Sequence, residues 1–185
     1  MRCGDLEVKR VEEARIDVPF ALLTGEAGAN TGSAPRSFQL VFQSWILRRQ
    51  DVVILIDPCA GNGRDRPVMP HFHQLETPYL DRLRATGISP GQVDIIFCTH
   101  LLCDHCGWNT RRQYGRWVPT FPNARFLLVR REVERWGIGR EDHAVIDYNL
   151  GVFEDSVQPI LDAGLADLVE AGQCGAKGSR PPARG

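Results

Sequence analysis

The sequence Thr99-His100-Leu101-Leu102-Cys103-Asp104-His105-Cys106-Gly107-Trp108-Asn109-Thr110 places three potential metal ligands directly after a predicted strand. The ligand-type side chains are those of His100, Asp104 and His105, and the apolar run 93–99 before them predicts the strand. Active sites of α/β folds gather at strand ends, where a loop can aim imidazole and carboxylate groups at one or two metal ions. The spacing indicates a metal site and leaves open one alternative, a capping aspartate with two solvated histidines.

The sequence on either side of this segment alternates between strand-like and helix-like stretches. Strands are predicted at 6–11, 37–47, Val52–Ile56, 93–99 and Arg125–Val129, and helices at 77–86, Arg130–Trp136 and 152–163. The polar break 48–51 predicts a hairpin, and the uninterrupted apolar run Val52–Ile56 predicts a strand covered on both faces. This order indicates an α/β layered fold, with a mixed rather than purely parallel sheet because it begins with a hairpin.

The composition is that of an ordinary soluble domain. The chain has 185 residues with 22 Lys plus Arg, 23 Asp plus Glu and a formal net charge of −1, which argues against a basic nucleic-acid binder. Hydrophobic residues make up 43% of the chain, enough for one core over residues 1–170. Residues 171–185 contain four Gly, two Pro and three Ala and no large apolar residue, so we expect a disordered tail.

The sequence offers no membrane or export signal. The longest apolar run, Val52–Ile56, is far shorter than the ~20 residues of a membrane-spanning helix, and charges interrupt the first twenty residues. We therefore expect a cytoplasmic, reducing location without membrane contact. There, the six cysteines are expected to be thiols or metal ligands rather than disulfides.

The segment at His100 resembles the signature His-x-His-x-Asp-His of the metallo-β-lactamase-fold hydrolases, and its surroundings resemble their lactonase-like branch. His100 matches the first histidine, Asp104 the aspartate and His105 the last histidine. The match extends to the segments 55–62, 107–110 and 119–124 and covers about residues 5 to 170. The resemblance implies an αββα sandwich, with His100, Asp104 and His105 as zinc ligands. It also implies that Asp57 supports the metal site, although capping the following turn is an equal expectation.

Two departures from the family pattern limit what the resemblance implies. Leu102 stands where the pattern has its second histidine, so one metal has lost a protein ligand. In the family, a second half supplies a further histidine, a bridging aspartate and a last histidine, whereas nothing after Val169 contains histidine. The sequence therefore resembles a fold truncated after its first half, with residues 1–170 as a partial domain.

The function implied by this resemblance is hydrolysis of lactone, ester or amide bonds in a small-molecule substrate. In the family, bound zinc activates a water, and Asp104 would orient the resulting hydroxide. We expect impaired activity, because ligands are missing. The alternative is a non-catalytic remnant that acts as an interaction or weak metal-binding protein. Because the fold packs two sheets together, the uncovered apolar face of one half predicts self-association.

Other residues could in principle form a site. Cys98, Cys103 and Cys106 have the spacing C-x4-C-x2-C of a plant-type iron–sulfur site, and Cys103 or Cys106 could join the histidines at zinc. Buried thiols are the simpler interpretation of all three. His71 and His73 are expected in a solvated loop anchored by Phe72. His143 lies among acidic residues that are typical of a surface helix start.

Overall fold

A seven-stranded mixed sheet runs through the described part of the chain, which in this computed structural model comprises residues 1–19, 37–137 and 149–170. In spatial order its strands are β1 (Arg2–Cys3), β2 (Leu6–Pro19), β3 (Ser37–Arg49), β4 (Val52–Ile56), β5 (Ile95–Cys98), β8 (Arg125–Val129) and β9 (Ala166–Val169). Strands β1 to β4 pair antiparallel, and β4, β5, β8 and β9 pair parallel. The mixed α/β sheet predicted from the sequence is confirmed.

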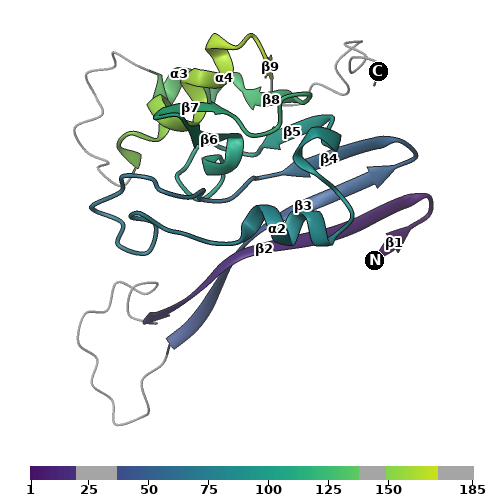
Figure 1. The fold of residues 1–185 in the computed structure, drawn as a ribbon, viewed down its shortest axis with the longest axis horizontal. Helices are drawn as coiled ribbons and strands as arrows, with labels where there is room; N and C mark the ends of the chain where they lie inside the picture. Colours follow the sequence, from purple (N-terminus) through teal and green to yellow (C-terminus); the bar gives the residue numbers. More distant parts are fainter. Residues whose placement is uncertain (20–36, 138–148, 171–185) are drawn as a thin grey trace.

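Short helices connect the parallel strands. They are α2 (Tyr79–Ala85), α3 (Arg130–Trp136) and α4 (Gln158–Asp162), with 3-10 turns at Pro90–Gln92 and Gly107–Asn109 and a π-helical turn at Phe153–Val157. Figure 1 shows α2 beside the long β2–β3 hairpin, and α3 and α4 near β8 and β9. The three predicted helices are present, although the first turn of the last one is a π-turn. Within the described ranges, no helix is both long and apolar enough to cross a membrane.

A second hairpin was not predicted from the sequence. It consists of β6 (Thr110–Gln113) and β7 (Arg116–Pro119), which pair antiparallel across Tyr114 and Gly115. Both turn residues have positive φ, 50° and 78°, as a two-residue type I′ turn requires. The strand Thr110–Gln113 is mostly polar and exposed. It lacks the apolar alternation by which a strand is recognised in a sequence.

The core lies on one face of the sheet. Alternate residues there are buried apolar side chains: Val11, Ile46, Val53, Leu55, Ile96, Phe126 and Leu128. The opposite face is only half-covered, and we call it the open face: Trp45, Leu47, Val52, Ile54, Ile56, Phe97 and Leu127. Trp45 is 41% exposed and Val52 40%. The expectation that Val52–Ile56 is covered on both faces is therefore wrong, because Val52 is exposed on this side and Ile54 and Ile56 are only half-buried.

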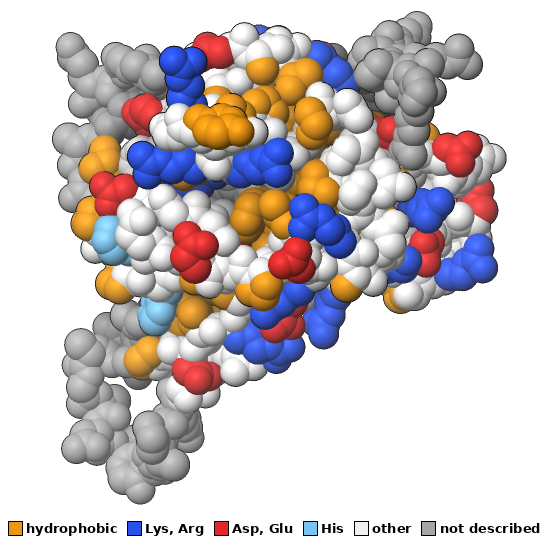
Figure 2. Space-filling view, viewed as in Figure 1, with side chains coloured by type: hydrophobic (Ala, Val, Ile, Leu, Met, Phe, Trp, Pro, Cys, Tyr) orange, Lys and Arg blue, Asp and Glu red, His pale blue; other side chains and the backbone are white. Residues whose placement is uncertain are grey.

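The surface carries both signs of charge. On the side drawn in Figure 2, basic and acidic side chains lie beside one another with apolar groups between them. This mixture agrees with the formal net charge of −1. The tail 171–185, for which we expect disorder, lies outside the described residues, as does His143.

Candidate metal centre

Two loops that follow adjacent parallel strands form the candidate site. Asp57 comes directly after β4, and Thr99 and His100 come directly after β5. The amide of Asp57 donates to the carbonyl of Phe97 at 2.9 Å, so the two strand ends lie side by side. As predicted, the segment that begins at His100 leaves the sheet at the carboxyl end of a strand.

Asp57 connects the two loops. Its Oδ1 accepts the Thr99 amide at 2.7 Å, and its Oδ2 accepts the Thr99 hydroxyl at 2.8 Å. That hydroxyl lies 3.0 Å from Nδ1 of His100. Asp57 Oδ2 also lies 3.2 Å from Nδ1 of His105. The side chain therefore supports both histidines. The backbone of Asp57 has φ 48°, a region that Asp adopts more readily than most residues.

The structure brings the three predicted ligand side chains into one cluster. The rings of His100 and His105 have their centroids 3.8 Å apart and are tilted by 44°. Nε2 of His105 lies 3.3 Å from Oδ2 of Asp104. Burial raises the pKa of Asp104, but the contact with His105 outweighs burial and leaves this pKa below its usual value. Burial lowers the pKa of His105, but Asp104 and Asp57 outweigh burial and raise it to about 9.

Leu102 lies in a turn between these ligands. The amide of His105 donates to the Leu102 carbonyl at 3.0 Å, and the Cys106 thiol donates to the same oxygen at 3.3 Å. An extended segment would place side chains 100 and 102 on the same side, as the His-x-His spacing suggests. The structure has a turn over 103–105 instead, so the side-chain alternation of a strand does not apply here.

The donor set fits zinc in kind but does not form a complete site. Two imidazoles and a carboxylate are ligands that zinc accepts, and catalytic zinc sites use three protein ligands and a water. Nδ1 of His105 is buried and has no hydrogen-bond partner in the described residues, because its contact with Asp57 lacks hydrogen-bond geometry. Yet across residues 1–19, 37–137 and 149–170, no three His, Cys, Asp or Glu side chains are arranged to hold a metal ion. Metal binding would have to reorient these side chains.

The two loops are also joined through their backbones. The amide of Gly107 donates to the carbonyl of Cys59 at 2.6 Å, and the amide of Trp108 donates to the carbonyl of Pro58 at 2.8 Å. A Cβ atom at position 107 would lie 1.7 Å from the Ala60 carbonyl oxygen, so only glycine fits. The contact fixes the distance between the Asp57 loop and the His105 loop.

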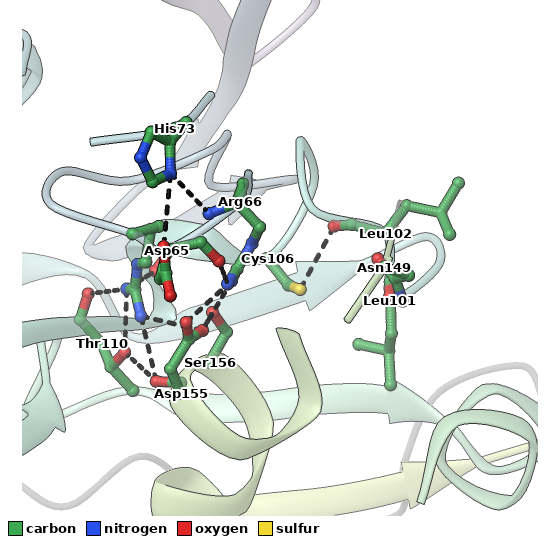
Figure 3. Close-up of polar contacts among 12 residues, drawn as sticks. Asp65, Arg66, His73, Leu101, Leu102, Cys106, Thr110, Asn149, Asp155 and Ser156 are labelled. Carbon is green, nitrogen blue, oxygen red and sulfur yellow. Dashed lines mark hydrogen bonds and ion pairs between the residues drawn. The ribbon is translucent and has the colours of Figure 1, made fainter. Parts of the chain in front are cut away.

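Two buried arginines, Arg64 and Arg66, join the loop after β4 to Asp155 in the π-helical turn; Figure 3 labels Arg66 and Asp155. Nη1 of Arg64 lies 3.0 Å from Oδ1 of Asp155, and Nη2 of Arg66 lies 2.8 Å from each of its two oxygens. Arg64 also donates to the carbonyls of Gly107 and Thr110. Burial lowers the pKa of Arg64 to about 10. This value is still high enough for the guanidinium to be charged at neutral pH. The sequence analysis did not single out these residues.

Glu13 is a further residue that the sequence analysis missed. Its side chain is buried, and it accepts hydrogen bonds from both candidate loops. In the sequence it is one of two adjacent glutamates in a strand with many charged residues, and nothing there separates it from its neighbour.

The competing sites named in the sequence analysis do not assemble in the described residues. Cys98, Cys103 and Cys106 are buried free thiols, as the simpler interpretation predicted, and Cys174 lies outside the described ranges. Phe72 is buried between exposed His71 and His73. Nδ1 of His73 accepts the Arg66 amide at 3.1 Å, which is a loop-stabilising contact.

Comparison with known folds gives consistent matches. The structure of the hydrolase AbOPH of the beta lactamase superfamily superposes with a TM-score of 0.66 at 22% identity, covering 94% of this chain and 60% of that one. AidC, a dizinc quorum-quenching lactonase in complex with a product, gives 0.66 at 17% identity, covering 94% and 61%. A probable metal-dependent hydrolase from Staphylococcus aureus gives 0.64 at 17% identity, covering 92% and 61%. These likenesses show a shared fold, and the chain spans about 60% of the length of these proteins.

Sequence comparison gives the family. No curated protein matches the chain. The family model described as the metallo-beta-lactamase superfamily matches residues 43–172, which include the second half of β3, all of β4 and β5, and both candidate loops. The match covers more than half of the 185 residues. By this match, and by the fold that it shares with the solved hydrolases, the chain belongs to the metallo-beta-lactamase superfamily.

Proposed function

We propose that this chain carries a weak, incomplete zinc centre of a hydrolase that cleaves lactone, ester or amide bonds. The observation that supports it best is the cluster of His100, Asp104 and His105 past the ends of β4 and β5. A dizinc lactonase among the proteins that share the fold supports a metal-activated water as the reagent. The substrate is proposed to be a small molecule, in a reducing, cytoplasmic setting suited to the buried thiols.

The side chains have distinct proposed roles. A bound zinc ion would supply a water with a pKa near ~7 and polarise the substrate carbonyl. His100 and His105 would bind zinc as imidazoles, and Asp104 through a carboxylate oxygen. Asp104 is also the proposed catalytic residue, because a carboxylate beside the water can accept its proton and orient it for attack. Asp57 would hold the His100 imidazole through the Thr99 hydroxyl, and the His105 imidazole by direct contact.

The leucine at position 102 limits metal affinity. It offers no lone pair to zinc, and no other ligand-type side chain in the described residues completes the set. A four-ligand zinc site contributes ~10 to 16 kcal/mol, so each ligand is worth roughly 3 kcal/mol, or about 10² in affinity. We therefore propose that turnover by these 185 residues is impaired.

The second candidate function is a non-catalytic one, in which the chain acts only as an interaction or weak metal-binding protein. In its favour, no three ligand-type side chains of the described residues are arranged to hold a metal ion. The two functions differ in one measurable property: hydrolysis that depends on both metal and Asp104.

Hydrolysis of simple lactones and aryl esters, with and without added zinc, tests the proposal. We expect a zinc-dependent rate about 10³-fold or more below that of a complete relative, and its loss in Asp104→Asn. Asp162→Asn, an exposed carboxylate at the end of α4, is the matched control and should keep the wild-type rate. A rate that chelator and Asp104→Asn leave unchanged would establish the non-catalytic alternative.

A further inference from the structure

Glu13 occupies an irregular position in β2. The pairing of β2 with β3 shifts between Glu12 and Ala14, so Glu13 is the extra residue of a β-bulge. Bulges re-aim one side chain and recur beside active sites. The carbonyls of Glu12 and Glu13 accept hydrogen bonds from Nη1 of Arg82 in α2, at 3.0 and 2.8 Å. The bulge is therefore anchored by a helix on the core side of the sheet.

The Glu13 carboxylate is buried, and both of its oxygens accept hydrogen bonds. The residue is 1% exposed. Its Oε2 accepts the amide of Ala60 at 2.7 Å, and its Oε1 accepts the amide of Gly61 at 3.0 Å and the indole N–H of Trp108 at 2.6 Å. Burial raises the pKa of Glu13 above its usual value, and the three donated hydrogen bonds oppose this rise. Three N–H donors suit the ionised form, which only accepts.

The three donors come from the two loops of the candidate metal centre. Ala60 and Gly61 follow Asp57 in the first loop, and Trp108 follows His105 in the second. The indole of Trp108 is itself fixed by stacking on Tyr79, with ring centroids 5.2 Å apart. Glu13 therefore links the segment that supports the histidines to the segment that carries them, without contacting a candidate ligand.

We propose that Glu13 is a positioning residue, which holds the Asp57 loop and the His105 loop at the separation that metal binding needs. The inference rests on the proposed zinc centre. A buried carboxylate is costly unless its oxygens are hydrogen-bonded, so the lowest-energy arrangement keeps both loops on Glu13. Residues that support metal ligands in this indirect way typically change metal affinity by ~10- to 100-fold when replaced.

Asp94 provides the control that distinguishes a positioning role of Glu13 from a general contribution to stability. Asp94 is also buried, and its Oδ2 accepts the Val53 amide at 2.8 Å. It lies just before β5, at the end of the sheet opposite the candidate site. Asp94→Asn should therefore lower stability as Glu13→Gln does, but leave the two loops in place.

Zinc affinity by chelator competition and the absorption spectrum of the cobalt-loaded chain test the proposal, on wild type, Glu13→Gln and Asp94→Asn. We expect Glu13→Gln to weaken zinc binding by about tenfold and to alter the cobalt spectrum, with Asp94→Asn close to wild type. If Glu13→Gln does not fold, Trp108→Phe removes one donor and keeps the ring, and a loss of about threefold is expected. Wild-type affinity and spectrum in the folded variant, or in Trp108→Phe, would overturn the inference.

Amide hydrogen exchange without metal separates this inference from the proposed function. We expect Glu13→Gln, or Trp108→Phe in its place, to speed exchange at 59–62 and 105–109, and Asp94→Asn to leave these amides unchanged. If wild type binds no zinc, the proposed function fails and exchange alone decides. Faster exchange in both loops would retain Glu13 as the residue that positions them, and unchanged exchange would overturn it.

Discussion

Oδ2 of Asp57 lies 3.2 Å from Nδ1 of His105 and accepts the Thr99 hydroxyl at 2.8 Å. One carboxylate oxygen of the loop after β4 thus contacts two residues of the loop after β5. The other ring nitrogen of His105, Nε2, lies 3.3 Å from Oδ2 of Asp104. Asp57 therefore joins the end of β4 to the loop that carries the candidate ligands.

Two substitutions at Asp57 should show how much stability comes from its acceptors for Thr99 and from its tolerance of a positive φ. Asp57→Ala removes both acceptors of Thr99 and places alanine at φ 48°, so we expect a loss of about 2 kcal/mol in the free energy of unfolding. Asp57→Asn keeps one carbonyl acceptor and a residue that tolerates positive φ, and should cost less than half as much. Urea denaturation measures both. Equal losses would show that neither the acceptor nor the backbone angle matters at this position.

Restoring an imidazole at position 102 should strengthen metal binding. Leu102 is half-buried and directly precedes the turn over 103–105. We expect Leu102→His to raise zinc affinity by roughly tenfold or more, measured by competition with a chelator.

The control for Leu102→His adds a histidine elsewhere. Gln113→His places it on exposed strand β6, away from the other ligands, and should leave zinc affinity at the wild-type value. If both variants bind zinc as wild type does, the turn over 103–105 does not present position 102 to the metal.

What the sequence could reveal depended on distance along the chain. His100, Asp104 and His105 were predicted because they lie within six residues and follow an apolar strand. Glu13 was not, because its donors lie 47, 48 and 95 residues away and a bulge leaves no local pattern. Arg64 and Asp155, 91 residues apart, were missed for the same reason. The turn at Leu102 was missed because the family spacing suggested an extended segment.

Because Gly107 lies so close to Ala60, we expect even the substitution of Gly107 by alanine to lower the stability severely. Gly107→Ala would place its Cβ 1.7 Å from a carbonyl oxygen, and both partners are backbone in loops that other contacts fix. We expect a loss of about 3 kcal/mol or more, measured by thermal or urea unfolding. Gly115→Ala is the control: its Cβ meets nothing within 4 Å, and only the φ of 78° makes it costly, by ~1 kcal/mol. Similar small losses in both variants would mean that the loops move apart easily.

The open face of the sheet has the character of an interface. Trp45 lies opposite Ile56 and Leu47 opposite Ile54, so apolar side chains continue across β3 and β4. A depression of about 430 Å³ lies at its edge, lined by Leu47 and Ile54 among others. Contiguous apolar surface of this kind is uncommon on monomers.

We propose that the open face covers a second copy of the chain, and we expect a dimer at micromolar concentration, of twice the 20.7 kDa chain mass. Trp45→Lys puts a charge on this face and should shift the chain toward the monomer. Tyr114→Lys, at a residue 96% exposed in the β6–β7 turn, should leave the dimer intact. Light scattering coupled to size exclusion measures all three. A monodisperse wild-type monomer with sharp, cooperative unfolding would show that the half-covered face is stable in water, and the proposed dimer would have to be abandoned.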